Sequence, residues 1–294
     1  MNAEESRNIR EVAIKGLLDR ADTPASEIRP STLFLQKTKA RLKPWAKVLL
    51  SALKLIPIAL IMTSLQVRND QSFARLNLNS QHWVKTDVFW YWQHRLPDLA
   101  MDYLEQFGWY WGLPVQAADW ALNSLVGIGI LFAFLNGIGS ACLVIWLEIM
   151  TICYGLRLLA MPLTPLPPSD SRCPLSPNLT GIPLYGYLSR GLGVWLGSYR
   201  TCTDKLFSGH TSAGLAILYL FWLHSDSHGL AFTYATLHYA LVLFLIVACR
   251  NHYTVDVVLG LIVSGLVIAL YELSRRRKKR ALTRSNPNAF TRVQ

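Results

Sequence analysis

Six long apolar segments constrain what this 294-residue chain can fold into more than any other feature. A helix needs about 20 mainly apolar residues to cross the hydrocarbon core of a bilayer. The sequence therefore predicts an all-α, polytopic membrane protein with six transmembrane helices. We place these spans at about Lys47 to Gln66, Trp120 to Asn136, Ala141 to Met161, the Ser208 turn to Trp222, Leu230 to Cys249 and His252 to Leu273.

The charge distribution predicts the orientation of these spans. The net charge is +11, and much of it lies before the first apolar segment and in the run 275–280 after the last. Basic residues beside membrane spans mark cytoplasmic ends, so we expect both termini in the cytoplasm. Because this rule accounts for the charge, we expect the lipid bilayer and no nucleic acid as a partner. A homo-oligomer stays open.

The same pattern divides the chain into three parts. Residues 1–43 are expected to form a cytoplasmic N-terminal segment without a cleavable signal peptide, since they are mostly polar. Residues 44–273 form the six-span catalytic domain, and residues 274–294 form a basic cytoplasmic tail.

Two polar motifs lie at the ends of apolar segments and carry the candidate chemistry. His252 and Asp256 are four residues apart, so on a helix they share one face. A carboxylate in that position can fix the tautomer of an imidazole and stabilise its cation. Ser208, Gly209 and His210 begin another helix, where free backbone N–H groups favour a phosphate oxygen. Together these features indicate phosphoryl chemistry.

The spacing of the two motifs predicts that they meet. His210 and His252 are 42 residues apart, which corresponds to one descent through a bilayer, a short turn and one ascent. With six spans and both termini inside, both histidines lie on the exoplasmic side. Two imidazoles and one carboxylate could also bind a metal, but the Ser-Gly turn would then have no role. We therefore expect no metal and no cofactor.

Other residues allow two interpretations each. Arg157, near the exoplasmic end of the third span, is either a phosphate ligand or a side chain that reaches the membrane interface. Trp and Tyr residues between the first two spans form either an interfacial belt or a site for a quaternary ammonium group. Cys173 and Cys202 share the expected exoplasmic loop, and the sequence leaves open whether they form a disulfide. His238 is expected to hydrogen-bond to its packing neighbours.

The motifs resemble those of the sphingomyelin synthase family, a branch of the lipid phosphate phosphatase superfamily. The third family motif, C-G-D-x3-S-G-H-T, is matched except for Thr203 in place of the glycine, and the likeness covers roughly residues 95 to 272. The matching residues are Cys202, Asp204, Ser208, Gly209, His210 and Thr211 in the third motif, His252, Tyr253, Thr254, Asp256 and Val257 in the fourth, Arg157 with Thr164 to Pro167 in the second, and Leu96, Pro97 and Asp98 in the first.

The resemblance implies an enzyme that moves a phospho-headgroup, typically phosphocholine from phosphatidylcholine, to ceramide and releases diacylglycerol. In that reaction His252 attacks phosphorus, Asp256 supports it, and His210 acts as general acid and base. Asp204, Ser208, Gly209, Arg157 and Tyr253 are the candidate substrate- or phosphate-binding residues.

Alternatives to this reaction remain open. The headgroup could be ethanolamine phosphate or inositol phosphate, and the enzyme could be another lipid phosphotransferase or a phosphatase of the same superfamily. A non-catalytic lipid-binding membrane protein is a further alternative. The exoplasmic face could belong to the Golgi, the plasma membrane or a bacterial inner membrane.

Overall fold

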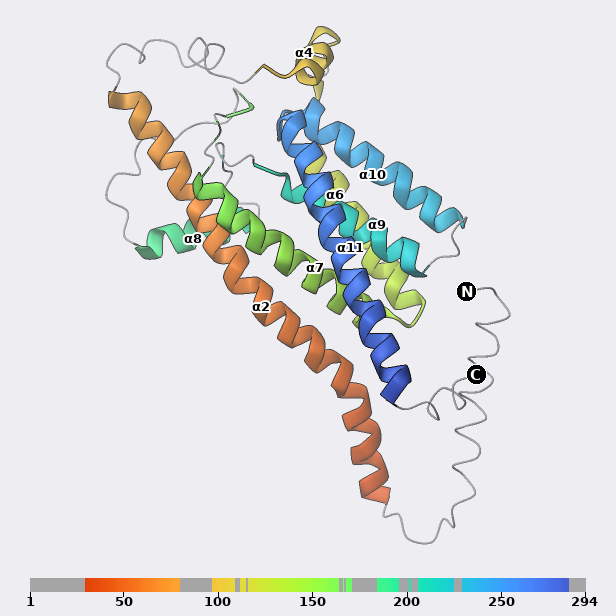
Figure 1. The fold of residues 1–294 in the computed structure, drawn as a ribbon. Coiled ribbons are helices and arrows are strands. Elements are labelled where there is room, and N and C mark those ends of the chain that lie inside the picture. The colour runs from red at the N-terminus through yellow and green to blue at the C-terminus, as the bar shows by residue number, and fades with distance from the viewer. Residues whose placement is uncertain are drawn as a thin grey trace. The chain divides into compact units, whose positions relative to one another are not determined.

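Helices make up almost all of the structure that can be described. The computed structural model describes residues 30–79, 97–108, 112–114, 116–163, 166, 168–170, 184–195, 201, 206–224 and 229–285, and every statement below concerns these residues. The elements, drawn in Figure 1, are α2 (Pro30–Asn79), α4 (Leu99–Gln106), α6 (Ala117–Leu135), α7 (Gly139–Ala160), η1 (Met161–Leu163), α8 (Leu184–Trp195), α9 (Gly209–His224), α10 (Leu230–Ala248) and α11 (Thr254–Ser285).

Among the described residues, five helices are long and apolar enough to cross a membrane, which supports an integral, multi-pass membrane protein. The fourth predicted span, from the Ser208 turn to Trp222, corresponds to α9, which has only 16 residues. At about 1.5 Å per residue this helix is shorter than a hydrocarbon core of about 30 Å. The fourth span, the total of six spans and the side of the termini remain predictions. The five apolar stretches are Pro44–Gln71, Ala117–Leu135, Gly139–Ala160, Leu230–Ala248 and Thr254–Lys278.

The chain forms two compact units, residues 47–268 and residues 1–46 with 269–294. The site described below lies within the first unit. The predicted domain boundaries after residues 43 and 273 stay predictions.

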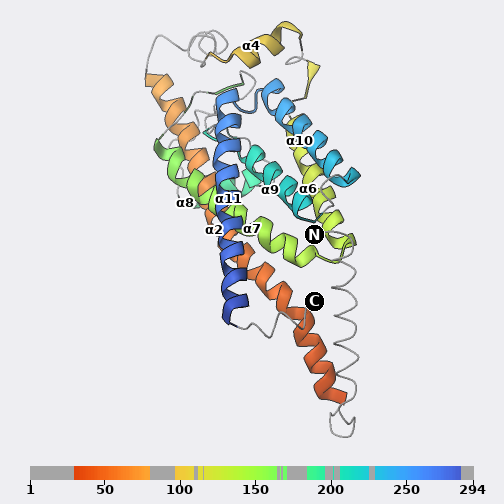
Figure 2. The same ribbon diagram turned by 45° about the vertical axis from the view of Figure 1, so that its right-hand side comes forward.

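Helix α9 lies at the centre of the first unit and contacts α6, α7 and α10. Figure 2 shows it among these neighbours. Most of its side chains are buried, including Ile217 and Phe221, and the Phe221 ring stacks on Phe132 of α6 with centroids 4.6 Å apart. Because other helices cover α9 on most sides, it has little contact with lipid. Its length of 16 residues therefore does not have to match the thickness of the hydrocarbon core.

Small residues allow the central helices to approach closely. A Cβ atom on Gly214 of α9 would lie 2.5 Å from the Tyr239 ring of α10. The Tyr239 hydroxyl donates a hydrogen bond to the Thr211 carbonyl at 2.8 Å, which fixes the ring in place. Close contact of backbones through glycine, with hydrogen bonds between helices, is typical of packing in membranes.

Polar side chains inside the spans are hydrogen-bonded to one another. Ser264 of α11 donates to the Ser212 hydroxyl of α9 at 2.7 Å. His238 of α10 lies 2.9 Å from the Tyr234 hydroxyl through Nδ1 and 3.1 Å from the Ser124 hydroxyl through Nε2. This contact set confirms the expectation that His238 bonds to its packing neighbours.

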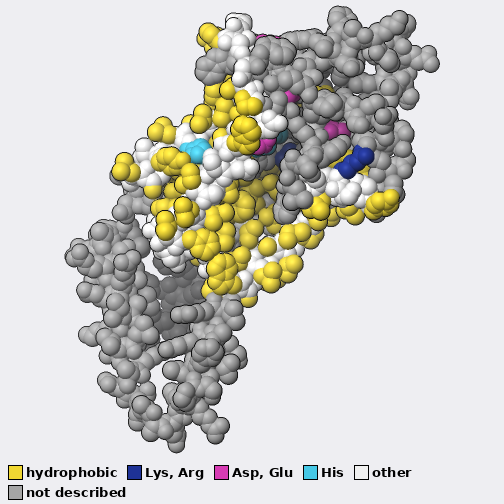
Figure 3. Space-filling view, turned by 180° about the vertical axis from the view of Figure 1, so that it is seen from behind, with side chains coloured by type: hydrophobic (Ala, Val, Ile, Leu, Met, Phe, Trp, Pro, Cys, Tyr) yellow, Lys and Arg dark blue, Asp and Glu magenta, His cyan; other side chains and the backbone are white. Residues whose placement is uncertain are grey.

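The outer surface of the spans is apolar. Leu237 of α10 is 68% exposed and Trp120 of α6 is 62% exposed. Figure 3 shows hydrophobic side chains over most of the described face, with charged side chains gathered toward one end. Such a continuous apolar surface fits a lipid environment.

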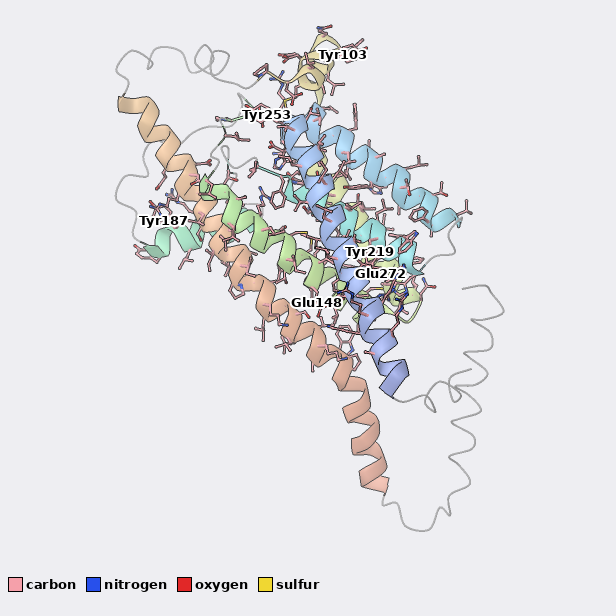
Figure 4. The ribbon with its side chains drawn as sticks, viewed as in Figure 1. Tyr103, Glu148, Tyr187, Tyr219, Tyr253 and Glu272 are labelled. Atoms are coloured by element: carbon pink, nitrogen blue, oxygen red, sulfur yellow. The ribbon has the colours of Figure 1, made fainter. Side chains whose placement is uncertain are left out.

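Two helices were not predicted from the sequence, α4 and α8. Helix α8 lies in the Pro- and Gly-rich segment after the third span and packs on α2. A Cβ on Gly191 would lie 2.7 Å from the Ser64 hydroxyl oxygen, and the Tyr187 hydroxyl donates to Gln71. Figure 4 shows Tyr187 on α8 beside α2. These contacts attach α8 to α2.

The contact at Gly214 predicts a packing defect. We expect Gly214→Ala to lower the free energy of unfolding by about 1–3 kcal/mol, because the added methyl group overlaps the fixed Tyr239 ring. Thermal unfolding in detergent measures this effect. Gly127→Ala on α6 is the matched control, since nothing lies within 4 Å of its new Cβ. Equal melting temperatures for the two variants would contradict the packing described here.

Candidate active site

The turn before α11 holds His252 next to a buried carboxylate. Asp256 is fully buried, and its Oδ2 accepts a hydrogen bond from the Tyr253 backbone N–H at 3.1 Å. The same oxygen lies 4.0 Å from His252 Nδ1. The His252 side chain is only 5% exposed, so little water screens this pair. His252 lies before the first residue of α11, Thr254, so the two residues do not share a helix as expected, but the interval of four residues still brings the carboxylate to the imidazole.

The start of α9 is joined directly to the start of α11. The Ser208 N–H donates to the Asp256 backbone carbonyl at 3.0 Å. Gly260, one turn further along α11, allows the approach, because a Cβ there would lie 3.0 Å from Thr211 Cβ. The Ser208 hydroxyl accepts the Thr211 N–H at 3.3 Å and so caps α9. Both sequence motifs thus share one hydrogen-bonded junction.

The two histidines meet across this junction. The ring centroids of His210 and His252 are 5.7 Å apart, with the ring planes at 68°. His210 is 26% exposed, whereas His252 is almost fully buried. The spacing of 42 residues predicted that both rings would reach the same depth, and the ring distance agrees with that prediction.

A second carboxylate, Asp119, was missed by the sequence analysis. Its Oδ1 lies 2.6 Å from His210 Nε2. Asp119 is in the first turn of α6, one residue before the predicted start of the second span. The only sequence signal was an acidic residue at the beginning of an apolar segment. Each histidine therefore has its own carboxylate neighbour, Asp119 for His210 and Asp256 for His252.

Arg157 lies against the first residue of α9. A Cβ on Gly209 would overlap Arg157 Nη1, so the guanidinium lies directly against this glycine. Arg157 is 6% exposed, so its guanidinium lies inside the protein. A helix N-terminus carries a partial positive charge, and the guanidinium adds a full one. The two together favour an anion at this position.

Asp98, from the first sequence motif, joins α4 to α11. Its Oδ1 accepts hydrogen bonds from the Ala100 and Met101 N–H groups and so caps α4. The same oxygen accepts the Thr254 hydroxyl at 2.8 Å, and Oδ2 accepts the Thr254 N–H at 2.5 Å. Asp98 is 9% exposed. This carboxylate therefore holds two helix starts, one of which follows His252 directly.

Among the described residues, no group of three or more His, Cys, Asp or Glu side chains has the arrangement of a metal site.

Several predicted features lie outside the described residues. The features outside are Asp204, the pair Cys173 and Cys202, the residues Leu96, Thr164, Pro165 and Pro167 of the motifs, and the aromatic residues Trp83, Trp90, Tyr91, Trp92, Trp109, Tyr110 and Trp111.

A comparison with known protein families finds a match in the C-terminal part of the sequence. Residues 201–273 match the PAP2 superfamily C-terminal domain. This match supports the lipid phosphate phosphatase superfamily, whose members are phosphatases and phosphotransferases, and thus an enzyme of that kind. No curated protein matches the chain. The PAP2-type domain contains His210, His252 and Asp256, while Asp98, Asp119 and Arg157 come from the chain before it.

The contacts of Asp98 predict a graded loss of stability. We expect Asp98→Ala to lower the free energy of unfolding by about 1–3 kcal/mol or more, because it leaves buried donors unpaired. Thr254→Val removes only the hydroxyl donor and should cost about 1 kcal/mol. Thr254→Ser keeps both donors and is the control. Chemical unfolding in detergent measures the series, and a smaller loss for Asp98→Ala than for Thr254→Val would contradict this assignment.

Proposed function

We propose that the protein transfers a phospho-headgroup from a glycerophospholipid to ceramide through a phospho-histidine intermediate. Phosphocholine from phosphatidylcholine is the leading donor group, giving sphingomyelin and diacylglycerol. The observation that carries this proposal is the pair of imidazoles with ring centroids 5.7 Å apart, each beside its own carboxylate. A double-displacement reaction needs a nucleophile that bonds phosphorus and a second group that moves protons, and two imidazoles can take these roles.

In the first half of the reaction, His252 is the nucleophile. Its Nε2 forms a bond to phosphorus, and the bond from phosphorus to the diacylglycerol oxygen breaks. Asp256, near Nδ1, stabilises the positive charge that develops on the imidazole. His210 gives its proton to the leaving oxygen, so diacylglycerol departs as a neutral alcohol. Because Asp119 engages Nε2 of His210, the proton would leave from Nδ1.

In the second half, ceramide replaces diacylglycerol in the same site. His210, now neutral, takes the proton of the ceramide primary hydroxyl, and that oxygen attacks phosphorus. The bond between phosphorus and His252 breaks, which returns both histidines to their starting forms. A histidine nucleophile can work near neutral pH.

The electrostatics of the site fit a phosphodiester. The α9 N-terminus and Arg157 supply positive charge, while Asp119 and Asp256 supply negative charge close by. A phosphodiester carries one negative charge, and a phosphate monoester near neutral pH carries almost two. The sequence also lacks the Lys and Arg-Pro signature of the soluble and lipid phosphatases. A phosphodiester lipid, whose phosphate still carries the headgroup alcohol, is therefore the better fit. We also propose that the site faces the exoplasmic side.

Hydrolysis is the second candidate, and the exposure of the proton-transfer pair favours it. Asp119 is 48% exposed and His210 is 26% exposed, so solvent reaches this side of the site. Water could then take the place of ceramide and release the free phospho-headgroup. His252 and Asp256 would keep the same roles in this reaction.

The donor and acceptor are tested with purified protein and phosphatidylcholine labelled in its headgroup phosphorus. We expect labelled sphingolipid when ceramide is present, and an acid-labile label on the protein when it is absent. His252→Ala should abolish both signals, because the nitrogen that bonds phosphorus is gone. His210→Ala should slow transfer by about 10²–10⁴-fold, the usual contribution of a positioned acid–base group.

The controls separate the alternatives. His238→Ala removes a hydrogen-bonded histidine of α10 and should keep activity in proportion to folded protein. Free labelled phosphocholine as the main product would favour hydrolysis. Parallel assays with ethanolamine and inositol phospholipids identify the headgroup. Full activity of His252→Ala would overturn the proposed mechanism, and a lack of turnover with every donor would favour a lipid-binding protein.

Asp119 gives a second prediction for the same reaction. We expect Asp119→Asn to lower kcat by about 10²-fold, because the His210 imidazolium loses its charged partner. Asp119→Glu keeps a carboxylate and should recover part of the rate. Steady-state kinetics measures both, with the amount of labelled protein in single turnover as a check on His252. A wild-type kcat for Asp119→Asn would show that this contact plays no part in proton transfer.

A further inference from the structure

Arg250, two residues before His252, has a backbone conformation that is unfavourable for its residue type. Its φ angle is +56°, in the left-handed region that glycine adopts freely and most other residues avoid. Such a conformation costs of order 1–3 kcal/mol in a residue with a side chain. The Arg250 side chain is also only 1% exposed. A charged, buried, strained residue in a turn indicates that its side chain has a specific role.

That side chain connects the turn to α4. Arg250 Nη2 donates to Glu105 Oε2, and the Glu105 side chain is 21% exposed. The Arg250 backbone carbonyl accepts a hydrogen bond from the Ser169 hydroxyl at 2.7 Å. Burying a guanidinium is tolerable only when it is paired and hydrogen-bonded. The ion pair and the Ser169 bond together hold the strained residue in place.

The other end of α4 is attached to the same turn. Asp98, the N-cap of α4, accepts two hydrogen bonds from Thr254, while Glu105 in the last turn of α4 binds Arg250. Residues 250 and 254 lie on either side of His252 in the sequence. Helix α4 therefore spans the turn and holds it at both ends. Figures 1 and 4 show α4 beside the ends of α10 and α11.

We propose that Arg250 and Glu105 are positioning residues for the phosphoryl-transfer reaction, which hold His252 at its distance from Asp256 and His210. This proposal rests on the proposed function. Chemistry at phosphorus needs the nucleophile at a fixed distance and direction, and a displacement of about 1 Å can cost about 10²-fold in rate. His252 Nδ1 lies 4.0 Å from Asp256 Oδ2, so a small shift of the turn changes this pairing.

A double-mutant cycle of Arg250→Gly and Glu105→Ala tests the proposal. Glycine removes the backbone strain, so Arg250→Gly should fold with little loss of stability. We expect each single variant to lower kcat by about tenfold to hundredfold with little change in KM. The double variant should be no slower than the slower single variant, because both changes break one interaction. Arg250→Lys, which keeps a cation, should recover part of the rate.

A second measurement does not depend on activity. Hydrogen–deuterium exchange of the amides at 249–256 should become faster in Arg250→Gly and Glu105→Ala, while exchange in the centre of α9 stays unchanged. Glu272→Ala is the matched control, because it breaks exposed ion pairs with Arg275 and Arg276 on α11. This control should change neither kcat nor exchange at 249–256.

The outcomes distinguish the proposals. Unchanged exchange at 249–256 in both variants, or kcat values that fall only with the folded fraction, would overturn the positioning role. Additive losses in the cycle would also overturn it, since the two residues would then act separately. If wild-type protein turns over no donor lipid, the proposed function fails, and the exchange rates alone decide whether α4 holds the turn.

Discussion

Asp256 makes the contacts on which the rest of the site depends. Its side chain is fully buried and accepts the Tyr253 N–H, and its carboxylate faces His252. Its backbone carbonyl accepts the N–H of Ser208 from the other motif. A buried carboxylate is costly unless hydrogen bonds or opposite charge compensate it. The same residue therefore orders the start of α11, supports the imidazole and joins the two motifs.

The membrane setting accounts for how tightly the surrounding helices pack. Lipid tails are as apolar as leucine side chains, so helices associate through close packing and hydrogen bonds rather than through exclusion of water. Gly214 and Gly260 allow α9 to approach α10 and α11, and Ser212 bonds to Ser264 across one of these contacts. A central helix fixed in this way keeps His210 in register with His252.

The PAP2-type domain supplies only part of the site. His210, His252 and Asp256 lie within the matched residues 201–273, and under the proposed function they carry out the phosphoryl transfer. The carboxylate beside His210, the guanidinium beside Gly209 and the cap that holds Thr254 come from α6, α7 and the residue before α4. These earlier segments surround the reacting groups. Under the proposed function, the choice of donor and acceptor would depend on them.

The sequence by itself determined the features that follow from short-range spacing and from length. Apolar segments of about 20 residues indicated the membrane spans, the interval of four residues placed Asp256 beside His252, and Ser208 and Gly209 marked the start of α9. The spacing of the motifs also predicted the meeting of His210 and His252, but only the tertiary structure decided which carboxylates meet which distant partners. The contacts of Asp119 with His210, Glu105 with Arg250 and Asp98 with Thr254 join residues 91, 145 and 156 positions apart. A carboxylate has no periodicity that identifies its partner, so these pairs depend on how the helices pack.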